Sequence, residues 1–433
     1  MLAAAASGAF WRWRLEFALL VAVAIGWRLL GDWLGELGAG LVVGALVAGV
    51  LAARPSRRVL IRWLRSARVR RRWRRAWIDV GLPRVAARRV RWLPAGPSVR
   101  IRCARGSSIA TVAAHAEPLA ACLGVREVRI GRDPEHAAWG TALLVERDPL
   151  DGGSQSWPLA DVDGPLSLWG AVPVGVDELG NTVAVSLPER NLLIGGEPGA
   201  GKSAAMGPVV ATAAMDPSVR LWLLDGKLVE LAAWELCAER VVGADVGEAI
   251  ALLEQVQRVM EERYRELLAR SQRKIGAEDG LPLHVIACDE LAFYLTAADR
   301  KQRARFAELL RDVVARGRAA GVIVIAATQK PAADVVPSAL RDLFGFRLAM
   351  RCTTPQASDT ILGQGWASQG HNAATIGPAQ RGVGLLLAED GLPVRLRSFY
   401  LDDQVLGQLA ERACALRADA WLAAQTPDTE ATS

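Results

Sequence analysis

The stretch Gly196-Glu197-Pro198-Gly199-Ala200-Gly201-Lys202-Ser203 has the G-x-x-x-x-G-K-S spacing of a phosphate-binding loop, or P-loop. It follows the apolar run 192–194 and precedes an Ala- and Val-rich stretch, 204–214, that can form a helix. Glycines let such a loop turn tightly and direct backbone N–H groups inward, and the helix adds its positive N-terminal end. The pattern predicts a nucleotide site in which Lys202 contacts the β- and γ-phosphates and Ser203 binds Mg²⁺. The alternative is a Gly-rich turn with a solvated lysine, which the strand-to-helix setting disfavours.

Length and composition predict two or three domains, since the chain has 433 residues, of which 51% are apolar, and the alternation of strand-like and helical stretches described below predicts an α/β fold. The six cysteines include no C-x-x-C pair and the four histidines are dispersed. This pattern favours neither a zinc site nor a disulfide framework, and it is typical of thiols in a reducing cytoplasm.

Two apolar runs, residues 15–30 and 37–53, predict an N-terminal transmembrane helical hairpin. Tryptophans flank the runs, and arginines precede the first and follow the second, so both ends are expected in the cytoplasm. The expected protein is therefore a multi-pass membrane protein whose larger, C-terminal part lies in the cytoplasm. A cleaved signal peptide is an alternative that the second run disfavours. A buried helical hairpin of a soluble protein is another, although the second run has no polar face.

The positive charge of the chain is concentrated between Arg54 and Arg91, where fifteen arginines accompany one acid, Asp79. Tryptophans alternate with the arginine clusters in this segment. Arginines beside a membrane bind anionic headgroups, and the same groups bind nucleic-acid phosphates. Position favours membrane lipid, and the two uses are compatible.

Composition and periodicity predict five segments. They are the anchor 1–53, an Arg-rich juxtamembrane segment 54–92, a small α/β domain 93–165, a motor domain 166–402, and a C-terminal helix with a disordered tail 403–433. Within 166–402, apolar runs alternate with helical stretches, which is typical of a mostly parallel sheet covered on both faces.

Ligands of such sheets bind beyond the carboxyl ends of the strands, and Asp289 and Glu290 directly follow the apolar run 284–288. Asp289 is expected to bind Mg²⁺, and Glu290 to orient or deprotonate the water that attacks the γ-phosphate. Gln329 follows the next run and is placed to sense the γ-phosphate. Arg318 precedes that run and is a candidate for stabilising transition-state charge in a neighbouring subunit, or else is a solvated helix-end arginine.

Five blocks in order make residues 172–400 resemble the FtsK/SpoIIIE family of membrane-anchored DNA translocases. The blocks are the P-loop, 224–231, Asp289-Glu290, 316–321 with 327–331, and 346–351 with 359–363. The resemblance implies a RecA-like P-loop ATPase that forms a homo-oligomeric ring, usually a hexamer, around double-stranded DNA. It also implies ATP and Mg²⁺ binding by Lys202 and Ser203, hydrolysis by Asp289 and Glu290, an arginine offered in trans by Arg318, and reading of the nucleotide state by Gln329 and Arg347.

The chain departs from the family's usual pattern in three respects, of which the first is that its anchor has two apparent spans where the chromosome-segregating members have more. Gly226 stands where the family has proline, and the chain ends about thirty residues after Tyr400, too short for a winged-helix module that reads oriented DNA. It is therefore more similar to the compact transfer proteins of actinobacterial conjugative elements, which implies conjugative DNA transfer. The alternatives are a single-motor relative of type VII protein-secretion ATPases and a non-hydrolysing membrane scaffold; the intact Lys202, Asp289 and Glu290 disfavour the latter.

Overall fold

The computed structural model describes residues 54–82, 84–133, 135–329, 335–389 and 391–425, with scattered residues between 24 and 42. The chain divides into two compact units, Met1–Asp148 and Pro149–Ser433. We consider each unit by itself.

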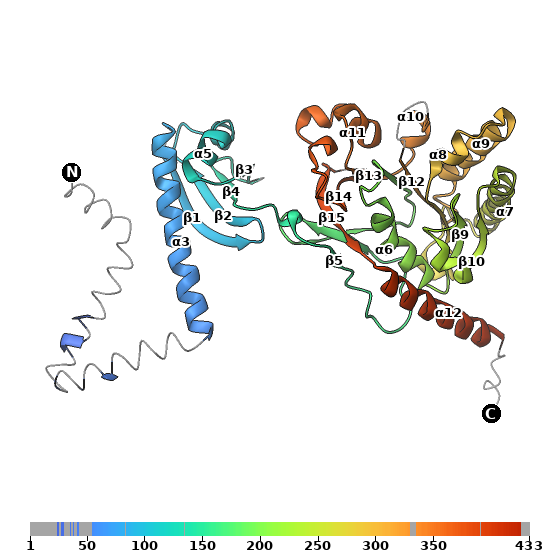
Figure 1. Cartoon of the computed structure of the whole chain (residues 1–433), viewed down its shortest axis with the longest axis horizontal. Coiled ribbons are helices and arrows are strands. Elements are labelled where there is room, and N and C mark those ends of the chain that lie inside the picture. The colour runs from blue at the N-terminus through green and yellow to red at the C-terminus, as the bar shows by residue number, and fades with distance from the viewer. Residues whose placement is uncertain are drawn as a thin grey trace. The chain divides into compact units, whose positions relative to one another are not determined.

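The first unit contains a four-stranded antiparallel sheet in the order β1-β2-β4-β3. Its elements are α3 (Arg54–Asp79), β1 (Val85–Leu93), β2 (Gly96–Cys103), α4 (Ile109–Ala113), α5 (Ala116–Leu123), β3 (Glu127–Arg132) and β4 (Trp139–Val145). Figure 1 shows the long helix α3 beside β1.

The arginine-rich stretch, expected as a segment of its own at 54–92, supplies α3 and β1 to this unit. Val69, Trp73 and Ala76 recur at helical spacing on α3 and are buried in the core of the unit. The indole Nε1 of Trp73 donates a hydrogen bond to the carbonyl of Val85, at 3.1 Å. Apolar residues between the arginines thus fasten the helix to the sheet.

The second unit is built on a large, mostly parallel sheet, in the order β10-β9-β11-β12-β8-β13-β14-β15-β6-β7, with β5 beside β15. From β10 to β13 neighbouring strands are parallel, and from β13 to β7 they are antiparallel. The prediction of an α/β fold with a mostly parallel sheet is confirmed. The strands are β5 (Gln155–Ser156), β6 (Val172–Asp177), β7 (Thr182–Val185), β8 (Leu192–Gly195), β9 (Arg220–Leu224), β10 (Ala238–Val242), β11 (His284–Cys288), β12 (Val322–Thr328), β13 (Phe346–Met350), β14 (Val383–Leu387) and β15 (Val394–Tyr400).

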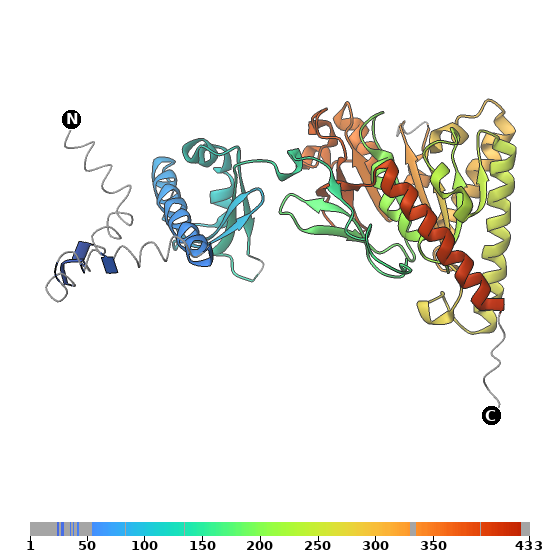
Figure 2. The same cartoon turned by 60° about the horizontal axis from the view of Figure 1, so that its bottom comes forward.

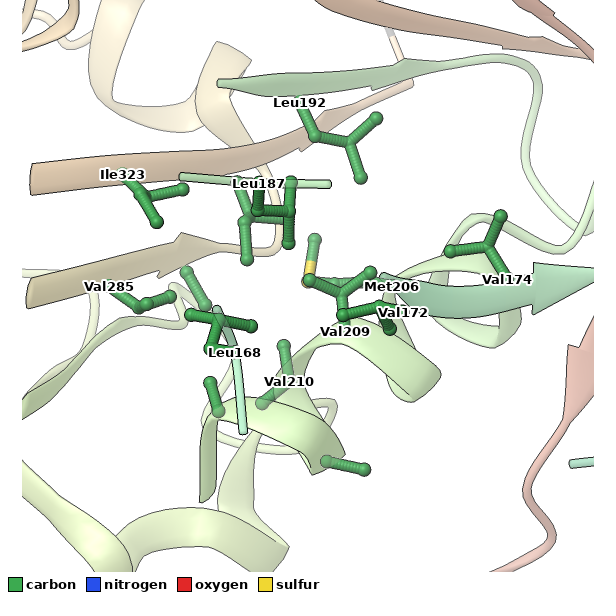
Figure 3. Packing of buried hydrophobic residues seen from close by; sticks show 14 of the residues in the cluster. Leu168, Val172, Val174, Leu187, Leu192, Met206, Val209, Val210, Val285 and Ile323 are labelled. Atoms are coloured by element: carbon green, nitrogen blue, oxygen red, sulfur yellow. The ribbon is translucent and has the colours of Figure 1, made fainter. Parts of the chain in front are cut away.

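Helices cover both faces of the parallel part of the sheet, because its strands are buried on both sides. The helices of this unit are α6 (Lys202–Ala214), α7 (Val246–Ala269), α8 (Leu291–Leu295), α9 (Arg300–Arg316), α10 (Ser338–Arg341), α11 (Pro355–Leu362) and α12 (Asp403–Gln425). Its 3-10 turns are η1 (Pro149–Asp151), η2 (Ala232–Cys237), η3 (Ala277–Asp279), η4 (Ala367–Gln369) and η5 (Ala373–Thr375). On one face, Met206 and Val209 of α6 pack with Leu192, Val285 and Ile323 of the strands (Figure 3). The helix that follows the P-loop is therefore seated on the core.

Helix α12 packs along α6 and η2 (Figure 2). The guanidinium of Arg417 donates to the carbonyls of Ala213, Ala214 and Val219 around the C-terminal end of α6. Cationic donors satisfy the unpaired carbonyls of a helix end. The C-terminal helix thus holds in place the helix that begins at the P-loop.

The prediction of a multi-pass membrane protein is contradicted, because no helix among the described residues is long and apolar enough to cross a bilayer. The two predicted spans, 15–30 and 37–53, lie almost entirely outside the described residues.

We predict that His284 makes the second unit sensitive to acid. Its side chain is buried at the start of β11, stacks on Trp222 and accepts a hydrogen bond from that indole at Nδ1, at 3.2 Å. Burial, helped by Arg263 and Arg220, lowers the pKa of His284 to about 4. Below pH ~6.5 the folded state therefore binds fewer protons than the unfolded state. As a result, the free energy of unfolding falls by about 3 kcal/mol as the pH is lowered from ~6.5 toward 4.

The His284→Asn variant keeps an acceptor for the indole but cannot take up the proton. Denaturant unfolding at pH 7 and pH 4 should show a smaller acid loss in this variant than in the wild type. Equal losses would assign the acid sensitivity to other groups.

Candidate nucleotide site

The P-loop connects β8 to α6 in a backbone shape that needs glycine. Gly201 has φ +105°, and a Cβ atom there would lie 2.7 Å from the backbone nitrogen of Gly382. The carbonyl of Ala200 accepts from that same nitrogen, at 2.9 Å. At the other end of the loop, the nitrogen of Gly196 donates to the carbonyl of Thr328, at 3.2 Å. The loop is therefore fixed by its neighbours before any ligand binds.

Lys202 is buried at the first turn of α6, and its ammonium lies inside the loop. Nζ donates to the carbonyls of Gly196, at 3.0 Å, and Glu197, at 2.8 Å. Burial lowers the pKa of Lys202, while Glu290 and Asp289 act in the opposite direction. A desolvated ammonium held by two neutral carbonyls suits an incoming phosphate group.

Asp289 directly follows β11 and is buried. Burial, the largest cause, raises the pKa of Asp289 to about 6, and repulsion by the carboxylates of Glu230 and Asp225 adds to this rise. Asp289, Ser203 and Glu230 line one pocket of about 160 Å³. A hydroxyl beside repelling carboxylates is a donor set that suits a hard divalent cation, so the residues present fit Mg²⁺.

The carboxylate of Glu290 bridges the ends of two neighbouring strands. It accepts hydrogen bonds from the Thr328 hydroxyl, at 3.0 Å, and from the backbone nitrogen of Gln329, at 3.1 and 3.2 Å. It also accepts from the nitrogen of Ala292, at 3.3 Å, and caps α8. The sequence analysis placed Glu290 and Gln329 in one site, and the structure brings Glu290 to the backbone of Gln329.

Arg318 and Arg347 lie away from the P-loop of their own chain. Arg318 precedes β12, at the end of the sheet opposite the loop, where it pairs with Glu389 at 2.8 Å and donates to the carbonyl of Glu189 at 2.5 Å. Arg347 lies near the start of β13 and contacts Asp342, at 3.3 Å. Neither side chain is brought together with Lys202.

Two other arginines, which the sequence analysis missed, contact the loop. Arg351 follows β13 and pairs with Glu197, at 3.1 Å, and Arg381 donates to the carbonyl of Gly199, at 3.2 Å. The position of Arg351 just beyond the carboxyl end of a parallel strand was a usable signal. Arg381 precedes the antiparallel strand β14, so its sequence position gave no such signal.

Asp225 organises a loop beside the site. Its buried carboxylate accepts from the backbone nitrogens of Lys227, Leu228, Val229 and Leu231, at 2.9 to 3.1 Å. This network fixes the segment that carries Glu230 to the pocket of Asp289.

We predict that Asp225→Asn lowers the free energy of unfolding of the second unit by about 2 kcal/mol, because an amide cannot accept all four bonds. Asp245→Asn is the matched control: Asp245 caps α7 with two similar bonds, and asparagine caps equally well. Denaturant unfolding of both variants tests this. Equal stability of the two would show that the four bonds at Asp225 do not hold the loop.

These parts together, a P-loop between a strand and a helix with an Asp-Glu pair two strands away, define a P-loop ATPase domain. Residues 167–382 match the FtsK/SpoIIIE family. The chain therefore carries an FtsK/SpoIIIE domain, as the sequence analysis predicted.

The relatives include the DNA translocase FtsK of Staphylococcus aureus, which is 25% identical over an alignment of 298 residues; the match covers 64% of this chain and 37% of the relative. The DNA translocase FtsK of Lactococcus lactis is 26% identical over an alignment of 340 residues; the match covers 71% of this chain and 42% of the relative. The chain thus spans less than half the length of these relatives.

Two solved structures share the fold. The pCW3 conjugation coupling protein TcpA, in a monomer form with ATPγS, has a TM-score of 0.54 at 17% identity, covering 80% of this chain and 99% of TcpA. EssC (ATPases 2 and 3) of Geobacillus thermodenitrificans has a TM-score of 0.50 at 16% identity, and the match covers 63% of this chain and 53% of that solved chain.

Proposed function

We propose that this protein is an ATP-driven translocase of double-stranded DNA that acts in conjugative transfer. The observation that carries the proposal is the arrangement of Lys202, in the P-loop after β8, with Asp289 and Glu290, after β11, on either side of β12 within an FtsK/SpoIIIE domain. The FtsK relatives support DNA as the substrate. The likeness in fold to TcpA, over nearly all of that protein's length, supports the conjugative role.

In this proposal the P-loop residues 196–203 hold the phosphates of ATP, with Lys202 as the cation that the phosphates approach. Ser203 and Asp289 hold Mg²⁺, which neutralises phosphate charge. Glu290 orients and deprotonates the attacking water, and Gln329, whose backbone contacts Glu290, reports the state of the site to β12. Arg351 and Arg381 support the loop, while Arg347 links nucleotide state to the start of β13.

Arg318 acts in a neighbouring subunit in this proposal. Its position at the far end of the sheet from its own P-loop disfavours action at that loop and supports action in trans, in a homo-oligomeric ring for which six subunits is the expected number. The ion pair with Glu389 then holds the guanidinium of Arg318 in place until the nucleotide site of a neighbouring subunit closes around it.

We predict partial recovery of ATPase activity when Arg318→Ala subunits are mixed with Lys202→Ala subunits. At some boundaries of a mixed ring, an intact P-loop faces an intact Arg318, whereas neither variant alone has such a boundary. The steady-state ATPase rate across mixing ratios is the measurement. If the ATPase rate of well-mixed rings equals the sum of the rates of the two variants measured separately, Arg318 does not have the proposed role.

A second candidate is the single-motor relative of type VII protein-secretion ATPases that the sequence analysis left open, and the likeness in fold to the ATPases of EssC is compatible with it. The two candidates differ in what stimulates hydrolysis. ATPase rates of the full chain should rise with duplex DNA and not with single strands or with an exported polypeptide. Stimulation by the polypeptide alone would favour the secretion motor.

A further inference from the structure

A basic groove lies in the first unit, between α3 and the start of the sheet. Its volume is about 860 Å³. The arginines that line it are Arg70, Arg71, Arg74 and Arg75 from α3, with Arg84 and Arg88 from the segment that begins β1. The residues that line the groove all belong to the first unit, whereas the residues of the nucleotide site belong to the second.

The groove carries positive charge without local acids to balance it. Among the described residues, no acid lines it, and Arg74, Arg75, Arg84 and Arg88 form no ion pair. Like charges gathered in one cleft focus a positive potential and oppose folding unless an anion neutralises them. The packing of Val69, Trp73 and Ala76 in the core beneath the arginines offsets this repulsion.

The arrangement of the charges indicates a linear polyanion. Arg70 and Arg74, like Arg71 and Arg75, are four residues apart on α3, so each pair is stacked one helical turn apart on the same wall. Arg84 and Arg88 provide charge from the other wall, and the exposed Arg62 and Arg65 extend the basic face of α3 beyond the groove. A succession of charges along a groove matches a chain of phosphates better than one compact anion.

We infer that this groove binds the phosphate backbone of duplex DNA, as a contact separate from the motor unit. A bilayer presents a nearly flat surface, whereas the two walls of a groove can both reach a convex backbone that enters it. The choice of duplex DNA as the polyanion rests on the proposed function. The contact would hold the DNA near the motor without reading its sequence, since phosphates carry no sequence information.

The test compares two variants of the full chain that each lose two positive charges from exposed arginines of the first unit. The groove variant is Arg74→Gln with Arg75→Gln, and the control is Arg105→Gln with Arg132→Gln, which lie outside the groove. Thermal unfolding first establishes that both fold. Anisotropy of a short labelled duplex then gives the dissociation constant over a range of salt concentrations.

The slope of log affinity against log salt becomes shallower by about 0.9 for each phosphate contact that is lost. We therefore expect the slope of the groove variant to be shallower than that of the wild type by about 1 to 2. Its affinity at low salt should fall about tenfold, and the control should match the wild type. A groove variant with the slope of the wild type would overturn the inference. So would loss of flotation with phosphatidylserine vesicles at an unchanged DNA slope, which would assign the groove to lipid.

The ATPase rate separates this inference from the proposed function. At saturating duplex the groove variant should be stimulated like the wild type. If duplex stimulates no variant while the slopes still differ, the translocase proposal fails and the groove remains a DNA contact.

Discussion

Glu290→Gln is expected to bind ATP about as well as the wild type and to hydrolyse it at least ~100-fold more slowly, the usual contribution of a general base. Glutamine keeps an oxygen that can accept from Thr328 and from the backbone of Gln329, so the ends of β11 and β12 stay joined. What the variant loses is the carboxylate that takes a proton from water. Binding by a fluorescent ATP analogue and phosphate release under single turnover separate the two effects.

A matched control is Glu278→Gln, an exposed glutamate in η3, which precedes the start of β11, whereas Glu290 follows the other end of that strand. It should hydrolyse ATP at the rate of the wild type. Hydrolysis by Glu290→Gln at that same rate would remove Glu290 from the role of base.

Lys202→Ala is expected to weaken ATP binding by about 100-fold or more, because the phosphates lose charge-assisted hydrogen bonds worth about 1.5–3 kcal/mol each. The substitution also leaves the carbonyls of Gly196 and Glu197 without their shared donor. A fold check by circular dichroism therefore accompanies the binding measurement, with Lys202→Arg as a second variant that keeps a cation.

Lys301→Ala is the control, since this lysine is exposed at the first turn of α9. It should bind ATP like the wild type. Tight ATP binding by a folded Lys202→Ala protein would contradict the assignment of the P-loop as the nucleotide site.

The parallel half of the sheet could be predicted from sequence because its strands are continuous apolar runs bounded by polar residues. The runs 284–288 and 346–350 coincide with β11 and β13. The antiparallel half was harder, since β6 pairs with its neighbour β7 but joins the rest of the sheet through β15, which lies far along the chain. Pairing across such distances leaves no local signal.

The residues of the candidate site also differ in how far the sequence predicts their positions. Asp289 and Glu290 directly follow β11, and the P-loop that carries Lys202 directly follows β8, so their meeting follows from the parallel order of β8, β12 and β11. The contact of Arg381 with the P-loop depends on where an antiparallel strand starts, which its neighbours in sequence do not specify. The arginine-rich stretch was hardest to interpret, because its charge obscured the apolar spacing that packs α3 on the sheet.

The central claim is that hydrolysis at this site moves the protein along duplex DNA. Displacement of a labelled third strand from the far end of a linear duplex measures this directly. The account predicts ATP-dependent displacement by the wild type, with a delay that lengthens as the duplex does, and none by Glu290→Gln. ATP hydrolysis without displacement on any duplex would contradict it.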